Sequence, residues 1–400
     1  MNLDSNKHAI DPAEQAALLL FRIGFGILCI ALPVIAAFSR RALVIIAPIG
    51  AVVLIFSALM IKDNRNAVRR ALNVLTSPVG LAALFIIFWS ALSLLWTPFP
   101  GSGAERLFRI VGTAGLAVGA IIALPKRMRA TNLYLLAVGV GLSAITLLGL
   151  LLFRSAEIDP TALERAAILT TLLAWPAVNW LAIKQRSLSS MAIAAAVGAI
   201  AIVFQGLSVL PALMIGAILL GGAINNSRAT AVALMSAVTV LIMAAPLIAI
   251  VLSFVAPQES GLGRTMQTWA DLIMADPGRL LTGHGLDTAL RNRISSVLDA
   301  GAPSSLLFEI WYELGVLGAL AVTTVMVLSI DKISHLGNAL APFVLGCFGF
   351  AFSLAVIGLG TSQTWWMTAL VVTAIAFAAV ANGEYRAQRP VALRSRTPEL

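Results

Sequence analysis

The sequence has few charged residues, and this scarcity excludes most soluble folds. Only 11% of its 400 residues are Asp, Glu, Lys or Arg, whereas 60% are hydrophobic. A typical soluble domain has roughly 25% charged residues. A soluble fold of this length could not cover so much apolar surface with so few charges. The composition therefore predicts that lipid surrounds much of the chain.

Cysteine and polar–apolar alternation are also scarce. The two cysteines, Cys29 and Cys347, lie inside apolar runs, and no spacing suggests a disulfide framework or a zinc site. Strands of a membrane barrel would alternate in segments of about ten residues. The apolar runs are instead continuous over about 17–25 residues, the length of a membrane-spanning helix. We therefore predict an all-α, polytopic integral membrane protein.

The apolar runs predict about twelve transmembrane helices. We place them at 21–38, 43–61, 79–96, 107–124, 131–152, 166–183, 190–205, 209–225, 229–254, 304–329, 336–358 and 364–382. These spans divide the chain into helices 1–9 (1–255), a large loop (256–302), helices 10–12 (303–383) and a basic tail (384–400).

The distribution of Lys and Arg predicts how the chain is oriented. The net charge of +9 comes from short clusters between spans, such as 62–70 and 126–129. Clusters of this kind indicate anchoring on anionic membrane lipid rather than nucleic-acid binding. The positive-inside rule then places both termini in the cytoplasm and the loop 256–302 on the far side. Arg40 and Arg41 violate this rule, because they fall on the far side.

The large loop contains recognisable local signals. Met266, Trp269, Leu272 and Ile273 recur at helical spacing, which predicts a short amphipathic helix at the membrane interface over 264–274. The sequence 276–278 (Asp-Pro-Gly) ends this helix. Gly283 and Gly285, in the sequence TGHGLD, predict a tight turn.

Two motifs in and after this loop resemble those of the O-antigen ligase and polymerase superfamily of bacterial envelopes. The first runs from Arg264 through Trp269 to GHGLD at 283–287, and the second is EIWYELGVLGAL at 309–320. The resemblance covers about 60 residues. Its shared motif residues are Gly283, Gly285, Asp287, Gly315 and Gly318.

The resemblance implies transfer of a glycan from undecaprenyl diphosphate to a lipid or glycan acceptor in the periplasm. This would be a metal-independent glycosyltransferase of the bacterial inner membrane, acting in lipopolysaccharide or exopolysaccharide synthesis without a cofactor. Arginine suits phosphate oxygens because its planar guanidinium donates two parallel hydrogen bonds. The arginines expected to bind the diphosphate are Arg264, Arg279, Arg291, Arg106 and Arg109. Each of them has an alternative interpretation as an interfacial anchor.

The chain departs from the family where the catalytic histidine is expected. The family pattern is His-Pro-His, but this sequence has Ala302, Pro303 and Ser304. We expect His284, Ser304 and Glu313 to supply the catalytic groups if the loop folds His284 toward Ser304. The alternative for His284 is a hydrogen bond within its own glycine-rich turn. Glu313 and its neighbour Glu309 lie four residues apart, and the alternative for both is an ion pair with an arginine such as Arg264 or Arg279.

Two other functions remain open. The missing histidine favours a catalytically inactive relative that binds lipid-linked glycan or an assembly partner. A transporter or permease would fit a broken span near Pro211, although the scarcity of charges within the spans argues against ion coupling.

Overall fold

The structure is a computed structural model that describes residues 12–60, 65–152, 159–203, 209–257, 259–299 and 301–383, and its regular structure in these ranges is helical. The basic tail predicted at 384–400 lies outside the described residues. The helices are α1 (Pro12–Gly26), the π-helical turn η1 (Ile27–Ala31), α2 (Leu32–Ala36), α3 (Ala42–Leu59), α4 (Arg65–Leu75), α5 (Pro78–Leu92), the 3₁₀ turn η2 (Ser93–Leu95), α6 (Pro100–Ala123), α7 (Ala130–Leu152), α8 (Pro160–Ile183), α9 (Ser187–Val203), α10 (Val209–Met243), α11 (Ala245–Val255), α12 (Gly261–Ala275), α13 (Arg279–Thr282), α14 (Thr288–Ile294), α15 (Leu306–Ser334), α16 (Ala341–Ile357) and α17 (Thr364–Ala381).

Within these ranges, nine helical segments are long and apolar enough to cross a membrane. This confirms the prediction of an all-α chain built from membrane-spanning helices. The nine are Pro12–Ala36, Ala42–Leu59, Pro78–Leu95, Pro100–Ala123, Ala130–Leu152, Pro160–Ile183, Val209–Met243, Leu306–Ser334 and Thr364–Ala381. The shorter apolar helices α9 and α16 coincide with the predicted spans 190–205 and 336–358, and α11 covers the end of the predicted span 229–254.

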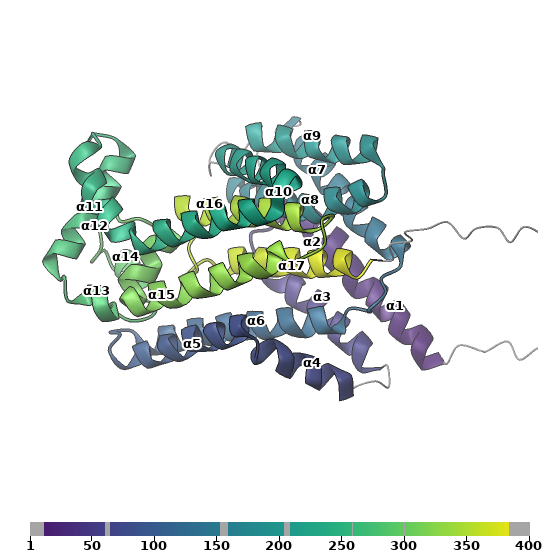
Figure 1. Cartoon of the computed structure of the whole chain (residues 1–400), viewed down its shortest axis with the longest axis horizontal. Coiled ribbons are helices and arrows are strands. Elements are labelled where there is room, and N and C mark those ends of the chain that lie inside the picture. The colour runs from purple at the N-terminus through teal and green to yellow at the C-terminus, as the bar shows by residue number, and fades with distance from the viewer. Residues whose placement is uncertain are drawn as a thin grey trace, which may run out of the picture.

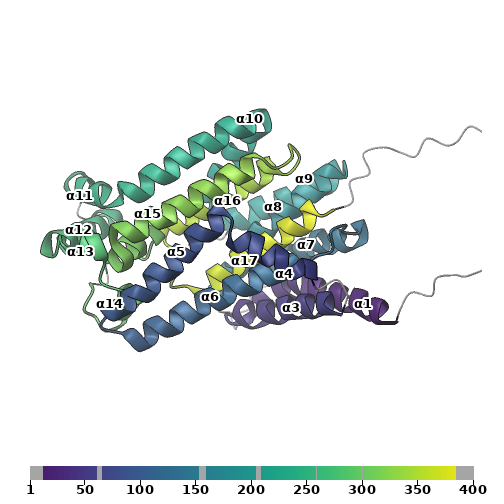
Figure 2. The ribbon, with the colours of Figure 1, turned by 60° about the horizontal axis from the view of Figure 1, so that its bottom comes forward.

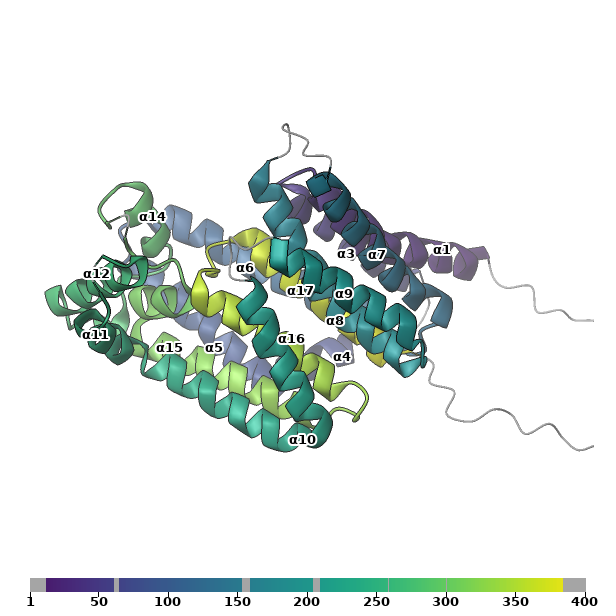
Figure 3. The same ribbon diagram turned by 90° about the horizontal axis from the view of Figure 1, so that it is seen from above.

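The predicted eighth and ninth spans differ most from the structure. α10 contains two arms that change direction at Asn226, where the backbone leaves helical geometry (φ −152°, ψ 95°). The two arms meet at a sharp angle in Figure 3. The Asn226 side chain caps the second arm, because its Oδ1 accepts a hydrogen bond from the Ala229 N–H at 3.0 Å. The boundary between the two spans is therefore where the sequence predicts it.

The predicted span 229–254 is not one continuous helix, because Pro246 interrupts it. α10 ends at Met243 and α11 begins at Ala245. Proline has no N–H to donate to the carbonyl four residues earlier, which is that of Ile242. That carbonyl accepts the Trp311 indole N–H instead, at 2.7 Å.

The starts of several long helices follow directly from sequence. Ser77, Asp159 and Ser305 cap α5, α8 and α15, since each side chain accepts a backbone N–H of the first turn at 3.0–3.3 Å. α5 and α8 also have proline at the first helical position.

The helices form a bundle with a separate group of short helices at one end. α11, α12, α13 and α14 gather at that end in Figure 1, which we call the loop end. α5 lies beside α15, and α6 packs on α17, as Figure 2 shows. α8 is enclosed by other helices along most of its length.

The amphipathic helix predicted in the loop is present as α12 (Gly261–Ala275), and Asp276 ends it as expected. Its apolar face packs on the protein, against α11 and the start of α15. Trp269 and Ile273 are buried, and the Trp269 ring meets Phe308 of α15 edge to face at 5.5 Å.

Candidate functional site

The segment Gly283–Asp287 crosses a break in α15 and is held there by backbone hydrogen bonds. The N–H groups of His284 and Gly285 donate to the carbonyls of Tyr312 and Glu313 at 2.8 and 2.9 Å. These carbonyls are available because α15 leaves helical geometry at Gly315 (φ 65°, ψ −160°). The next carbonyl, that of Leu314, accepts the indole N–H of Trp89 from α5 at 2.9 Å.

Glycine is required on both sides of this crossing. Gly283 has φ 71°, and a Cβ there would lie 2.2 Å from the Glu313 carbonyl oxygen. A Cβ on Gly315 would lie 2.6 Å from the Leu281 carbonyl oxygen. The positive φ and the close backbone approach both exclude a larger side chain. The tight turn predicted at Gly283 and Gly285 is therefore confirmed.

Next to this crossing, Arg106 of α6 lies among three carboxylates. Its Nη1 is 2.8 Å from Glu313 Oε1 and 3.6 Å from Asp287 Oδ1, and its Nη2 is 3.3 Å from Glu309 Oε2. All four side chains are buried, with at most 4% of each exposed. We call Arg106, Asp287, Glu309 and Glu313 the buried charge cluster. Ionised groups at this depth are tolerated only when they are paired.

The carboxylates of the cluster have further donors. Glu309 accepts hydrogen bonds from the Thr361 hydroxyl at 2.9 Å, from the Ser362 N–H at 3.0 Å and from the Ser362 hydroxyl. The Ala289 N–H donates to Glu313 at 3.2 Å. Arg291 of α14 forms an ion pair with Asp287 at 3.0 Å. The cluster therefore ties α6, α14, α15 and the start of α17 together.

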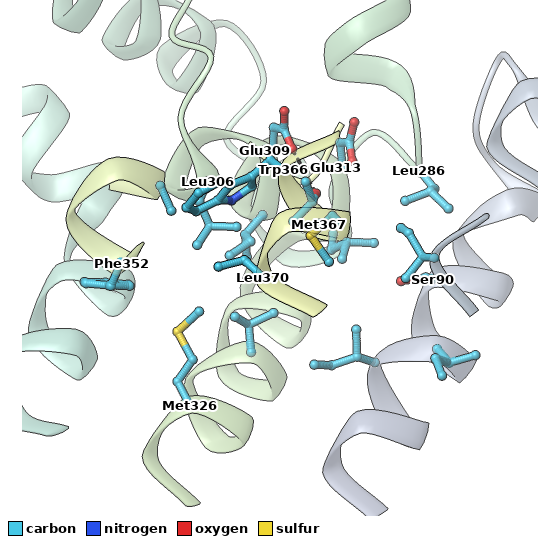
Figure 4. A pocket seen from close by; sticks show the side chains of 18 of the residues that line it. Ser90, Leu286, Leu306, Glu309, Glu313, Met326, Phe352, Trp366, Met367 and Leu370 are labelled. Atoms are coloured by element: carbon cyan, nitrogen blue, oxygen red, sulfur yellow. Dashed lines mark hydrogen bonds between the residues drawn. The ribbon is translucent and has the colours of Figure 1, made fainter. Parts of the chain in front are cut away.

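An apolar cavity of about 390 Å³ lies next to the buried charge cluster. In Figure 4, Glu309 and Glu313 stand at one edge of the cavity, with their carboxylate oxygens turned away from Met326 and Leu370. Apart from the two glutamates, Ser90 and Thr361, the lining is apolar. The cavity can thus receive an apolar chain whose polar end lies beside the carboxylates.

Within the described residues, no group of three or more His, Cys, Asp or Glu side chains is arranged to hold a metal ion. The three acids of the buried charge cluster face guanidinium groups instead.

The structure does not bring His284 and Ser304 together. The His284 ring stacks on Tyr312, with centroids 4.2 Å apart, and its Nδ1 is 3.1 Å from the Tyr312 carbonyl oxygen. The Ser304 hydroxyl lies 3.5 Å from the Gly358 carbonyl oxygen. The expected convergence of the two side chains is wrong, because stacking and the Tyr312 carbonyl hold the imidazole against α15. The alternative of a hydrogen bond within the glycine-rich turn is also wrong, since the partner belongs to α15.

The surroundings of His284 favour the neutral imidazole. Burial lowers its pKa from the usual 6.5, and the hydrogen bond with the Tyr312 carbonyl opposes this shift. The positive charge of Arg279 lowers the pKa further. The ring is therefore an uncharged packing group at neutral pH.

The arginines expected to bind diphosphate do not share one site. Arg106 belongs to the buried charge cluster and Arg291 lies at its edge. Arg109 and Arg279 are partly exposed and lie 3.6 Å from the exposed acids Glu105 and Asp276. Arg264 is exposed on α12, in an open polar groove that also contains Asp271 and Asp299.

The alternative interpretation of Glu309 and Glu313 as partners in an ion pair is confirmed, but the proposed arginine was wrong. Their partner is Arg106, not Arg264 or Arg279. The sequence offers one weak signal for this, because Arg106 lies directly before the predicted span 107–124 and belongs to the long apolar helix α6. Thr361 and Ser362 were not predicted, and nothing local in the sequence marks them.

No protein-family model and no curated protein matches this chain. The resemblance to O-antigen ligases and polymerases thus stays a prediction. It depends on the motif residues, of which Gly283, Gly285, Asp287 and Gly315 lie together at the crossing described above.

Proposed function

We propose that this chain transfers a glycan from a polyprenyl diphosphate to an acceptor hydroxyl at the outer face of a bacterial inner membrane. In this proposal the chain crosses the membrane twelve times, both termini are cytoplasmic, and the loop end faces the periplasm. The main support is the apolar cavity that ends at the buried charge cluster. An isoprenoid chain needs such an apolar cavity, and the glycan needs the polar edge.

The reaction proposed here needs a base and a cationic environment. The acceptor oxygen forms a bond to the anomeric carbon of the glycan, and the bond from that carbon to the diphosphate oxygen breaks. The diphosphate leaves with the bonding electrons, and a carboxylate takes the acceptor proton. Glu313 is our candidate for this base, because it lines the cavity and is held in place by Arg106.

The negative charge on the leaving diphosphate requires arginines that are not already committed. Both terminal nitrogens of Arg106 are already engaged, with Glu309, Glu313 and Thr361. Arg109 and Arg279 have only exposed acidic partners at 3.6 Å, which a diphosphate can displace. Because these two arginines do not share one site and neither lines the apolar cavity, we propose each of them as a separate candidate for contact with the diphosphate.

A second candidate function is binding of lipid-linked glycan without turnover. It is favoured by the many hydrogen bonds that the two glutamate carboxylates already accept. Glu309 and Glu313 each accept several hydrogen bonds, and His284 is held against Tyr312 away from the cavity. A base so well satisfied is a weak proton acceptor.

The test is deletion of the gene, followed by electrophoresis of the surface polysaccharide and complementation with variants. We expect deletion to change the polysaccharide ladder. Glu313→Gln should fail to restore it, although the variant keeps hydrogen-bonding capacity and reaches wild-type levels in the membrane. The matched control is Glu259→Gln, at an exposed loop position, which should complement fully.

Each outcome separates the candidates. An unchanged ladder after deletion would exclude transfer to surface polysaccharide. If deletion changes the ladder and Glu313→Gln restores the wild-type pattern, the Glu313 carboxylate takes no part in the reaction. This result would favour binding without turnover. Ser304→Ala and His284→Ala should both complement if Glu313 is the base.

A further inference from the structure

A second pocket lies on the other side of the start of α17, and arginines dominate it. Arg40 and Arg41 from the α2–α3 connection and Arg165 of α8 line it together with Trp365 of α17. Its volume is about 390 Å³. We call it the arginine pocket. It is separate from the apolar cavity, which is lined by Trp366 rather than Trp365.

Two of the three guanidinium groups are held in place by the protein. Arg165 stacks over the Trp365 ring at 5.1 Å, and its Nη1 donates to the Arg40 carbonyl at 3.1 Å. Arg40 forms an ion pair with Asp159 at 2.5 Å. The cation–π contact and the ion pair therefore pre-organise two of the three arginines.

The acids near the pocket do not neutralise it. In the described ranges, Asp159 and Glu164 are the carboxylates close enough to act on Arg165, and three arginines line the pocket. Arg41 is exposed and forms no ion pair within the described part of the chain. Among the described residues, the pocket therefore has a net positive charge, and the Arg41 guanidinium is available for a ligand.

Two helix N-termini add to the positive potential. α3 begins at Ala42 and α17 at Thr364, and neither has a side-chain cap. Residues of both first turns, Val44 and Thr364, line the pocket. The first N–H groups of a helix have no partner within the helix, and they favour an anion.

An exposed apolar stripe runs down α3 from the pocket. Ile45, at the pocket, is followed at helical spacing by Ile49, Val52 and Phe56, and these side chains are 37–59% exposed. This combination of a cationic head site and an apolar strip fits an amphiphile. A soluble anion would contact only the arginines and not the apolar stripe.

We infer that the arginine pocket binds the phosphate group of an anionic membrane lipid, whose acyl chain lies along the stripe on α3. Arg41 and Arg165 bind the phosphate oxygens, and Ile45 and Ile49 contact the chain. This accounts for Arg40 and Arg41, which the positive-inside rule leaves unexplained. The inference is independent of glycan transfer, because it uses no residue of the apolar cavity.

The experiment measures lipid binding to the purified full-length protein in a non-ionic detergent by native mass spectrometry. The probes are a short-chain phosphatidylglycerol, the matching diacylglycerol and inorganic phosphate. We expect phosphatidylglycerol to bind and Arg41→Gln to raise its Kd about tenfold, the effect of losing one charge-assisted hydrogen bond. Arg228→Gln, which removes an exposed arginine between the arms of α10, is the matched control and should leave the Kd unchanged.

Because Arg41 forms no ion pair in the described part of the chain, Arg41→Gln should have the same melting point as the wild type. Ile45→Ser should also weaken phosphatidylglycerol binding severalfold, since it shortens the apolar strip. Equal binding of diacylglycerol, or equal Kd values for Arg41→Gln and the wild type, would overturn the site. Inorganic phosphate that binds as tightly as phosphatidylglycerol would overturn the lipid assignment.

Discussion

Arginine has opposite roles in the buried charge cluster and in the arginine pocket. Arg106 has 4% of its side chain exposed and reaches three carboxylates from other parts of the chain. Arg40 is 63% exposed, and its neighbour Arg41 has no acidic partner in the described ranges. Burial makes pairing obligatory, so the first group holds the fold together. Exposure leaves charge uncompensated, so the second group remains available to a ligand.

The largest effect is expected from removing the buried arginine. Arg106→Ala leaves three buried carboxylates without their cation, which should cost about 3–5 kcal/mol of unfolding free energy. The midpoint of thermal unfolding in detergent measures this loss.

Arg109→Ala is the matched control on the same helix. Arg109 is 46% exposed and its only ion pair in the described chain is with the exposed Glu105, so its loss should cost less than about 1 kcal/mol. Equal melting points for the two variants would remove the distinction between the two kinds of arginine.

A backbone substitution tests whether the buried charge cluster depends on the break in α15. Gly315→Ala forces a side chain onto a residue with φ 65° and places its Cβ 2.6 Å from the Leu281 carbonyl oxygen. The strain alone should cost about 1–3 kcal/mol, again read from thermal unfolding. Gly112→Ala on α6 has open space around its Cβ and should be neutral or stabilising. A stable Gly315→Ala protein would show that the break is unnecessary.

A pH titration tests how His284, which is partly buried, contributes to stability. Because the folded protein lowers the pKa of His284 below 6.5, the unfolded chain binds its proton more readily. Stability should therefore be full above about pH 6.5 and decline as the pH falls from there. His284→Gln should flatten this part of the profile of melting point against pH.

The smallest effect is expected at the exposed pair of Arg40 and Asp159. Arg40→Gln should cost less than about 1 kcal/mol, and the difference from wild type should vanish at about 1 M salt because salt screens exposed charges. A larger, salt-independent loss would mean that the arginine pocket is as structural as the buried charge cluster.

Much of the fold follows from local sequence. Apolar runs of sufficient length determine the helices, and Ser77, Asp159 and Ser305 begin them through capping. Asn226 marks the turn between the arms of α10 for the same reason. Pro246, which interrupts the predicted span 229–254, is visible in the sequence. The apolar run around it is long enough to span a membrane, and the run was therefore predicted as one helix.

The site was less predictable, because its contacts join distant parts of the chain. Arg106 and Glu313 are about 200 residues apart, and nothing near either residue specifies the other. Gly283, Gly285 and Gly315 were recognisable as motif residues, but their mutual packing was not. His284 was assigned a catalytic position from its residue type, whereas its stacking on Tyr312 depends on how the loop crosses α15.

The crossing of Gly283–Asp287 over the break in α15 has a consequence for how the loop can move. Three main-chain oxygens of that helix, at Tyr312, Glu313 and Leu314, find their donors outside it. Lifting the loop would strip two of these oxygens of their partners in a region with little water, where each orphan costs several kcal/mol. These hydrogen bonds therefore hold the segment Gly283–Asp287 firmly in place on α15.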